Sequence, residues 1–332
     1  MVLTLSWLET RKVIRVGEKS YAVTLPKKWV DLLGISPGDT VDVLFDKSGY
    51  ICIRPRKFEA SKAVEPVVRL KASDCGVLVD KCVSGCYTEG HDVISLELEG
   101  PAPALSDVSS KLPGVVVVEG EGNEVVIKIA ISESIVSFDE VINRMIKVLE
   151  NMYSYVERLI ETGDPKCGEE VLKGDDELDR LFFLGLRLVK RTIMTKLLEK
   201  DISYARELLD IAMLIRSIEH VGDALDRSVR ILQEVEMKPI RDTLLELFRL
   251  SSKIIFDALY AYRRVNLRTI SRILEMRREL RRKVMNMRKE APLSIQGILN
   301  ELDLIATLAE DIIDITVSRF IRMLEKRPTS GQ

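Results

Sequence analysis

Residues 212–229 read Ala-Met-Leu-Ile-Arg-Ser-Ile-Glu-His-Val-Gly-Asp-Ala-Leu-Asp-Arg-Ser-Val, and their apolar residues recur with the period of an α-helix. At about 100° per residue, one stripe of this helix is apolar and predicts a core-facing surface. The stripe contains Ile211, Leu214, Ile215, Ile218, Gly222, Leu225 and Val229. Glu219, Asp223 and Asp226 form a narrow acidic stripe along its edge. Like charges spaced i, i+4 repel by about 0.2–0.5 kcal/mol, so the pattern indicates a compensating cation nearby.

The same pattern returns further along the chain, where Glu310 corresponds to Glu219 and Asp314 to Asp223. Asp303 extends this second acidic edge. The apolar stripe beside it consists of Leu302, Ile305, Ala306, Ala309, Ile313, Thr316 and Phe320. A repeat of this length predicts two copies of one helical unit, each with a Glu-x-x-x-Asp pair at the same place.

Charge is balanced overall but unevenly distributed. The 332 residues carry a formal net charge of −2 and are enough for several domains with ample core. Residues 1–58 carry about +4, residues 59–136 about −7 and residues 263–289 about +9. A local basic patch is a hint of a polyanionic partner, whereas the overall balance gives none.

The start of the chain has no basic leader, because Glu9, Arg11 and Lys12 soon interrupt its first apolar residues, so no signal peptide is expected. No apolar run approaches about 18 residues, so no membrane span is expected either. We therefore predict a cytoplasmic location. Five unevenly spaced cysteines favour reduced thiols over a disulfide framework.

The first predicted domain, residues 1–58, consists of short strands and tight turns. Strands are expected at 12–16, 21–25, 40–45 and 50–54, with a short helix at 27–33 that begins after Pro26. Ser36-Pro37-Gly38-Asp39 has proline and glycine where a type II turn requires them. A unit of this size has a small core, and pairing with a second copy is a common remedy.

The run Ser20-Tyr-Ala-Val-Thr-Leu-Pro-Lys-Lys-Trp-Val-Asp-Leu-Leu-Gly34, followed by Ile-Ser-Pro-Gly-Asp39, resembles swapped-hairpin DNA-binding domains of the AbrB/SpoVT/MazE type. The resemblance implies an intertwined homodimer whose basic hairpin face contacts DNA. The candidate DNA-binding residues are Arg11, Lys12, Arg15, Lys19, Lys27 and Lys28. Such contacts go to phosphates and do not specify a base sequence. The alternative is that these charges only solvate a dimerisation module.

The second predicted domain, residues 59–136, is a small α/β connector. Strands are expected at 64–71, 92–98, 115–119 and 124–131, with helices at 74–87 and 104–112. Cys75, Cys82 and Cys86 fall on roughly one face of the first helix, with His91 just beyond. Zinc ligands are one interpretation, but no Cys-x-x-Cys occurs, and buried thiols are favoured.

From residue 137 onward helical periodicity dominates, with helices expected at 138–162, 168–200, 203–236, 239–265, 267–290 and 293–327. Short connections imply antiparallel packing as two consecutive three-helix bundles, residues 137–236 and 237–332. The fold class is therefore multidomain: a small β-rich swapped-hairpin domain, a small α/β domain, and all-α tandem three-helix bundles.

The second long helix carries its own acidic cluster, Asp175-Asp176-Glu177-Leu-Asp179, near its start. If it packs antiparallel to the third helix, its carboxylates meet those of Glu219 and Asp223. Several converging carboxylates require a bridging cation, and oxygen ligands suit Mg²⁺, Mn²⁺ or iron. Alternatively, the cluster complements a helix N-terminus, while Glu219 and Asp223 pair with arginines of neighbouring helices.

The phrases Asp-Asp-Glu-Leu-Asp-Arg-Leu (175–181) and Ile-Glu-His-Val-Gly-Asp-Ala-Leu-Asp (218–226), on doubled three-helix bundles, resemble PhoU, the phosphate-uptake regulator family. The resemblance implies metal clusters of iron or zinc, and a regulatory link to the phosphate ABC transporter ATPase or its sensor kinase. Magnesium remains a further candidate ion. The metal ligands carried over are Asp176, Asp179, Glu219, Asp223, Glu310 and Asp314. An AbrB-like head joined to PhoU-like bundles is similar to a fused form among archaeal PhoU-like proteins.

The fifth helix departs from the family pattern, because it is basic where an acidic pair would face Glu310 and Asp314. An ion-pair network is therefore an alternative to a second metal cluster. The basic helix is either a solvated face or a docking face for an anionic partner.

An enzyme is the rival class. Di-iron oxidase bundles use Glu-x-x-His pairs, but Gly222 stands three residues after Glu219, and His220 is expected to point off the acidic stripe. The sequence has no Gly-x-x-x-x-Gly-Lys phosphate loop and no Gly-x-Ser-x-Gly elbow. We therefore expect no enzymatic activity, and predict a dimeric, phosphate-responsive, metal-binding regulator with a DNA-binding head. The alternative is an adaptor that docks on the transporter or kinase and whose head only dimerises.

Overall fold

The computed structural model describes residues 9–45, 51–56, 67–98, 110–119, 123–131, 136–196, 202–236, 238 and 240–325. The chain divides into two compact units, Met1–Val64 and Glu65–Gln332. Within the described ranges, no helix combines the length and the apolar character needed to cross a membrane.

The N-terminal unit is built from two strand pairs and one short helix. β1 (Ile14–Arg15) pairs with β2 (Tyr21–Ala22), and β3 (Val41–Phe45) pairs with β4 (Ile51–Pro55), both antiparallel. α1 (Lys27–Leu32) lies between them and begins directly after Pro26, as expected for a residue whose fixed φ suits a helix start. The strands β1 and β2 are shorter than the sequence predicts, although the β-rich character is confirmed.

Apolar side chains of this unit lie largely in solvent within the single chain. Val13 is 64% exposed, Tyr21 73%, Val43 64% and Phe45 78%. A cluster of exposed apolar residues on a unit this small marks an interaction surface. The surface is compatible with the homodimer expected from the sequence, which stays a prediction.

Residues 67–131 contain a four-stranded mixed sheet in the order β5-β6-β8-β7. β5 (Val67–Lys71) is parallel to β6 (Val93–Glu97); β8 (Glu124–Ile129) is antiparallel to both β6 and β7 (Val115–Glu119). Tyr87 and Val83 of α3 (Val79–Thr88) are fully buried against Ile94 and Ile127 in the core of this α/β region. Most of the helix predicted at 104–112 lies outside the described residues.

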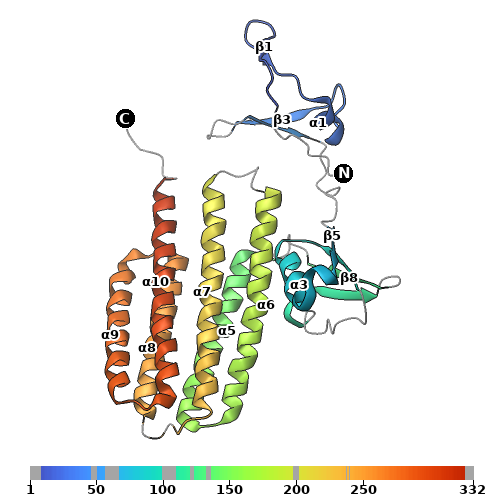
Figure 1. The fold of residues 1–332 in the computed structure, drawn as a ribbon. Helices are drawn as coiled ribbons and strands as arrows, with labels where there is room; N and C mark the ends of the chain where they lie inside the picture. The colour runs from blue at the N-terminus through green and yellow to red at the C-terminus, as the bar shows by residue number, and fades with distance from the viewer. Residues whose placement is uncertain are drawn as a thin grey trace, which may run out of the picture. The chain divides into compact units, whose positions relative to one another are not determined.

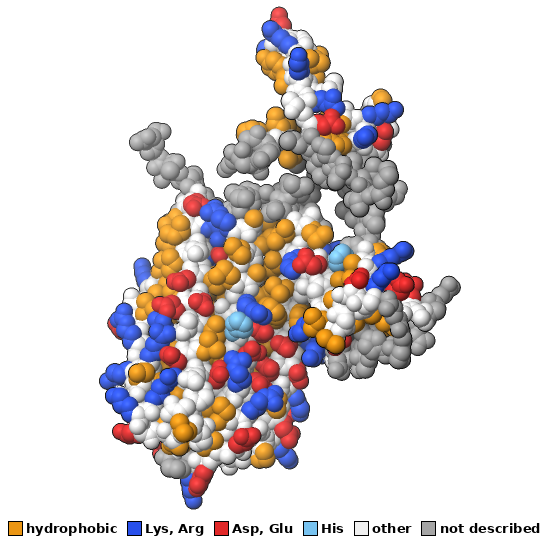
Figure 2. All heavy atoms as spheres, in the orientation of Figure 1, with side chains coloured by type: hydrophobic (Ala, Val, Ile, Leu, Met, Phe, Trp, Pro, Cys, Tyr) orange, Lys and Arg blue, Asp and Glu red, His pale blue; other side chains and the backbone are white. Residues whose placement is uncertain are grey.

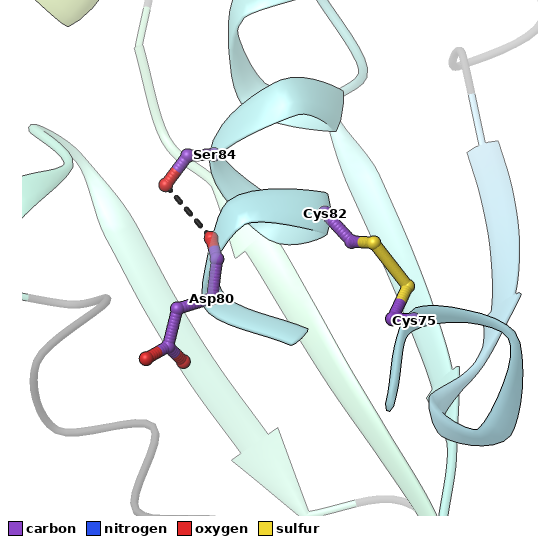
Figure 3. Close-up of a disulfide and its surroundings, with 4 residues drawn as sticks. All are labelled: Cys75, Asp80, Cys82 and Ser84. Atoms are coloured by element: carbon purple, nitrogen blue, oxygen red, sulfur yellow. Dashed lines mark hydrogen bonds between the residues drawn. A yellow bond between two sulfur atoms is a disulfide. The ribbon is translucent and has the colours of Figure 1, made fainter. Parts of the chain in front are cut away.

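The helix predicted over 74–87 is interrupted. α2 (Ala72–Cys75) and a 3₁₀ turn (Gly76–Leu78) precede α3, and Gly76 has φ of +56°, a conformation that glycine adopts readily. The break brings Cys75 and Cys82 together as a disulfide, with their Cα atoms 6.4 Å apart (Figure 3). The expectation of reduced thiols is therefore wrong for this pair, whereas Cys52, Cys86 and Cys167 are free.

The remaining chain forms six long α-helices with short connections (Figure 1). They are α5 (Phe138–Thr162), α6 (Pro165–Lys196), α7 (Ile202–Leu232), α8 (Arg241–Arg264), α9 (Ile270–Glu290) and α10 (Gln296–Glu325). The first begins with a capping box, in which Ser137 accepts from the Glu140 backbone N–H and the Glu140 carboxylate accepts from the Ser137 N–H. Gly163, with φ of +71°, ends it in the left-handed conformation.

Helices α5–α7 pack as one three-helix bundle and α8–α10 as a second, which confirms the predicted fold class. The bundles are not separate, because α7 packs against α10 and α5 against α8, and one continuous apolar core runs through both. The two repeated helices are antiparallel, since Arg206 pairs with Glu325 and Arg227 with Glu301.

A buried arginine attaches the α/β region to the bundle. Arg187 of α6 has no exposed surface, donates hydrogen bonds to the carbonyls of Tyr87 and His91 at 3.0 and 2.7 Å, and pairs with Asp92. Arg191, one turn on, pairs with Asp92 at 3.1 Å. A buried guanidinium needs such partners, because an unpaired buried charge is costly. The α/β region is therefore held firmly on the side of α6.

Candidate metal centre

Helices α6 and α7 approach closely at Gly222. A Cβ atom at this position would lie 2.4 Å from the Leu178 side chain and 3.5 Å from Asp175 Oδ1. Only glycine leaves room for this contact, and it brings the acidic segment of α6 against the acidic edge of α7. Figure 2 shows the result as a gathering of acidic side chains over α6 and α7.

Three carboxylates converge at this contact. Asp179 of α6 and Glu219 and Asp223 of α7 each offer one oxygen, and these oxygens lie within 4.8 Å of one another. Glu219 is only 7% exposed, and its Oε2 is buried without a hydrogen-bond partner. Buried carboxylate oxygens are normally satisfied, so an unpartnered one inside a carboxylate cluster fits an absent cation. We call Asp179, Glu219 and Asp223 the acidic triad.

Burial and mutual repulsion make the ionised triad unfavourable without a cation. Loss of solvent, followed by repulsion from Asp223, raises the pKa of Glu219 to about 7. The pKa of Asp179 is raised by the same two effects. A bound cation reverses this cost, because it stabilises the ionised form of each ligand.

Arginines of α7 already compensate part of the negative charge. Arg216 Nη1 lies 3.5 Å from Glu219 Oε1, and Arg227 Nη1 lies 3.2 Å from Asp223 Oδ2. These pairs lie within one helix, not between helices as the alternative interpretation supposed. They use only one oxygen of each carboxylate, and Glu219 Oε2 remains for another ligand.

His220 departs from the sequence expectation. Its Nε2 lies 3.6 Å from Glu219 Oε2, so the ring lies near the triad and not away from it. Desolvation and the charge of Arg216 lower the pKa of His220, which keeps the ring neutral near pH 7. A neutral imidazole beside the triad does not add to the positive charge that balances it.

The acidic cluster at the start of α6 splits between two environments. Asp176 is exposed and does not belong to the triad, although the resemblance to PhoU carried it over as a ligand. Asp175 lies beside Gly222, and its Oδ1 is buried without a hydrogen-bond partner. Burial and the neighbouring charge of Asp226 raise the pKa of Asp175 to about 7. The i, i+4 spacing of Asp175 and Asp179 puts them on one helical face, and this spacing was the sequence signal that Asp175 lies near the site.

The second copy of the motif has a different partner. Glu310 pairs with Arg277 of α9, whose Nε also donates to the Ala306 carbonyl at 2.8 Å. Asp314 is exposed, and Asp303 Oδ1 lies 3.1 Å from Arg281 Nε. Among the described residues, the only cluster with metal-site spacing is the acidic triad. The surroundings of Glu310 and Asp314 thus resemble the ion-pair network that the basic fifth helix suggested.

The six candidate DNA-binding residues are all exposed in the N-terminal unit. Arg15 also supports the β1–β2 turn, since its guanidinium donates to the carbonyls of Gly17 and Glu18 at 3.1 and 3.2 Å. Arg11 pairs with Glu9. The remaining four, Lys12, Lys19, Lys27 and Lys28, present free ammonium groups on the described surface.

Comparison with protein families finds two matches, one over most of the N-terminal unit and one within the first three-helix bundle. Residues 14–61 match the family described as antidote-toxin recognition MazE, bacterial antitoxin. Residues 142–232 match the PhoU domain family, and this range contains the whole acidic triad. Both expected resemblances are confirmed. No curated protein matches the chain.

The two matches lie in different parts of the chain, one similar to MazE and one similar to the PhoU domain. Both matched families are regulatory and not enzymatic. The PhoU domain suggests phosphate-uptake regulation, and the MazE-like segment fits a DNA-binding or antitoxin-type role.

Proposed function

We propose that this protein is a phosphate-responsive regulator of phosphate uptake, which binds a metal ion through its first three-helix bundle and DNA through a dimeric N-terminal unit. The observation that carries the proposal is the acidic triad, with the unpartnered oxygen of buried Glu219, inside the range that matches PhoU. Function of this kind depends on binding and conformational response, so no catalytic residue is assigned.

The triad fits a hard or borderline cation. Asp179, Glu219 and Asp223 supply three oxygen donors, which suit magnesium and iron and are also used by zinc. The ion would neutralise the clustered negative charge and join α6 to α7. Arg216 and Arg227 orient the two α7 carboxylates by holding one oxygen of each. Metal binding would therefore stabilise the packing of α6 against α7.

Elemental analysis of the purified protein tests the metal site. The wild type is compared with Glu219→Ala/Asp223→Ala and with Glu310→Ala/Asp314→Ala. We expect the first pair of substitutions to abolish bound metal and the second pair to leave it unchanged. A wild type without metal, even after reconstitution with iron, zinc, manganese and magnesium, would contradict the proposal.

DNA binding is supported by the exposed basic residues of the N-terminal unit and by the match to MazE. Contacts of lysine and arginine with phosphates predict retention on DNA that weakens steeply with salt. Lys12→Ala/Lys19→Ala is the informative variant, because neither lysine supports the β1–β2 turn as Arg15 does. We expect reduced retention at low salt with the oligomeric state unchanged, measured by sedimentation.

A second candidate function is that of an adaptor, in which the N-terminal unit only dimerises and the bundles dock on a phosphate transporter ATPase or a sensor kinase. The exposed apolar side chains of that unit favour dimerisation without requiring DNA. Wild-type protein that forms dimers but is not retained on any DNA at low salt would support the adaptor and contradict DNA binding.

A further inference from the structure

The Cys75–Cys82 disulfide joins a segment with few buried contacts to the helix α3 (Figure 3). The segment comprises α2 and the 3₁₀ turn after it, residues 72–78, and neither element contains a buried residue. Val77 is fully exposed and Leu78 is 57% exposed. Cys75 itself reaches the edge of the α/β core, where it is only partly buried. Because so little apolar surface is buried here, the attachment of this segment to α3 depends on the disulfide.

α3, in contrast, is anchored on two sides. Its residues Val83 and Tyr87 are fully buried in the core of the α/β region, and the helix packs against α6. Arg187 of α6, which has no exposed surface, donates a hydrogen bond to the Tyr87 carbonyl at 3.0 Å. The disulfide therefore ties residues 72–78 to a helix that is held on the bundle.

The strand before this segment, β5, is held on one side only. Among the described strands it pairs with β6 alone, at the edge of the sheet. Its last residue, Lys71, is also the N-cap of α2. The N-terminal unit ends at Val64, so β5 is the first described strand after that unit. An edge strand opens more easily than a central one, and β5 with α2 therefore decides how firmly this part of the chain is held.

The disulfide is accessible to thiols from solution. Cys75 and Cys82 are both partly exposed, and their neighbours Gly76 and Lys81 are exposed. Thiol–disulfide exchange begins when a thiolate reaches one of the two sulfurs, so its rate depends on this access. A disulfide in such a position can be opened while the protein remains folded.

The third cysteine of this region does not compete for the bond. Cys86 is a free thiol on α3, four residues after Cys82, and packs against the α/β core. Burial, followed by the charge of Glu89, raises the pKa of Cys86. Because the thiolate is the attacking form, Cys86 is a poor internal nucleophile, and opening the bond requires an external thiol.

We propose that Cys75 and Cys82 form a reversible redox site that controls how firmly β5 and α2 are held on the α/β region. A dithiol reductant opens the bond: one of its thiolates attacks one cysteine sulfur, and the other cysteine leaves as a thiolate. The second thiol of the reductant then displaces the first cysteine and becomes part of a disulfide. Two electrons pass from the dithiol to the cysteines, and each cysteine thiolate takes up one proton.

The expected structural change is local. The fully buried residues Val83, Tyr87, Ile94 and Ile127 lie on α3 and the two central strands, not on residues 72–78, so the core does not depend on the bond. Reduction should therefore leave α3 in place while β5 and α2 open more often. The proposal is independent of the metal site, and the failure of either leaves the other standing.

The test is hydrogen exchange of the full-length protein, read by mass spectrometry, in the oxidised state and after reduction with dithiothreitol under native conditions. Thiol labelling with peptide mapping identifies the free cysteines in each sample, and oxidised glutathione tests whether the bond returns. Cys75→Ser lacks the bond in both states. Cys86→Ser is the matched control, because Cys86 is a partly exposed cysteine of α3 that takes no part in the disulfide.

We expect reduction to free two thiols, those of Cys75 and Cys82, and oxidised glutathione to restore the bond. Backbone amides of residues 67–78 should exchange about tenfold faster in the reduced wild type, with α3 and α6 unchanged. Cys75→Ser should show the fast exchange in both states, and Cys86→Ser should respond as the wild type does.

Equal exchange of residues 67–78 in the oxidised and reduced wild type would overturn the proposal. A bond that dithiothreitol opens only after denaturation would do the same, as would a cysteine pair that oxidised glutathione cannot join in the folded protein. Faster exchange throughout the chain on reduction would also contradict it, because the bond would then stabilise the whole fold. The wild type is compared with itself in two states, so these outcomes do not depend on whether a variant folds.

Discussion

The two three-helix bundles carry the same Glu-x-x-x-Asp motif on their last helix but surround it differently. In the first bundle Glu219 is buried and faces Asp179 across a helix contact. In the second, Glu310 is 42% exposed at its side chain and pairs with Arg277 of α9. The motif is therefore not sufficient to define a metal site. The neighbouring helix decides whether the two acids face further acids, which require a cation, or an arginine, which replaces it.

The residue at the helix contact differs between the two bundles. Gly222, which lets α6 approach α7, corresponds to Ile313 in the second bundle, where the side chain is 4% exposed. A buried isoleucine occupies space that the first bundle gives to the contact with Leu178 and Asp175. One residue of the repeat thus changes both the packing and the surroundings of the carboxylates.

The largest expected effect follows from removing the α6 ligand. Asp179→Asn should lower metal affinity by on the order of 100-fold, because it removes one of three anionic donors with little change in volume. Glu310→Gln, in the corresponding motif of the second bundle, should leave metal affinity unchanged. Competition with a chelator of known affinity measures both values. Equal losses in the two variants would mean that both bundles hold metal.

The helix contact at Gly222 gives the next largest effect. Gly222→Ala should lower the free energy of unfolding by about 2–3 kcal/mol, because the added methyl group overlaps fully buried Leu178. It should also weaken metal binding by separating Asp179 from Glu219. Gly85→Ala is the control, since Gly85 is helical and has open space around it. Urea denaturation measures the stability of the two variants. A Gly222→Ala protein that is more stable than the wild type would contradict the close contact.

The metal-free triad should make stability depend on pH. Burial raises the pKa values of Glu219 and Asp175 to about 7 in the folded protein, above those of the unfolded chain. The folded state therefore binds these protons more tightly, and the stability they contribute is present at acidic pH and is lost as pH rises through about 7. In Glu219→Gln, the loss of unfolding free energy between acidic and alkaline pH should be about 2 kcal/mol smaller than in the wild type.

The measurement is urea denaturation of chelator-treated protein at pH 5 and pH 8. Glu310→Gln should keep the wild-type pH dependence, because Glu310 does not belong to the acidic triad. A wild type whose stability rises over this interval would contradict the environment described for Glu219.

Periodicity was sufficient to predict the six long helices, because each of them buries an apolar stripe that its own sequence defines. The prediction for α5, residues 138–162, agrees with the structure at both ends, since Ser137 and Gly163 provide strong start and stop signals. The disulfide was missed because the helix over 74–87 was assumed to be continuous. Gly76, where the chain breaks, was the available signal.

The site was only partly predictable. The spacing of Glu219 and Asp223 indicates a shared face, but which acid of α6 meets them depends on the rotation of α6 against α7. That rotation is fixed by packing around Gly222 and Leu178, so sequence spacing did not separate Asp175, Asp176 and Asp179. The attachment of the α/β region, in which Arg187 of α6 pairs with Asp92, depends on tertiary contacts that no local pattern contains.

The smallest expected effect concerns the arginine of the second bundle. Arg277 is 11% exposed at its side chain and contacts both Glu310 and the Ala306 carbonyl, so Arg277→Ala should cost about 1–2 kcal/mol of stability. Its metal content should match the wild type, because Asp314 is exposed and, among the described residues, only the acidic triad has metal-site spacing. Urea denaturation and elemental analysis on the same sample separate the two effects. Metal gained in Arg277→Ala would show that the arginine, and not the helix spacing around Ile313, is what keeps a cation out of the second bundle.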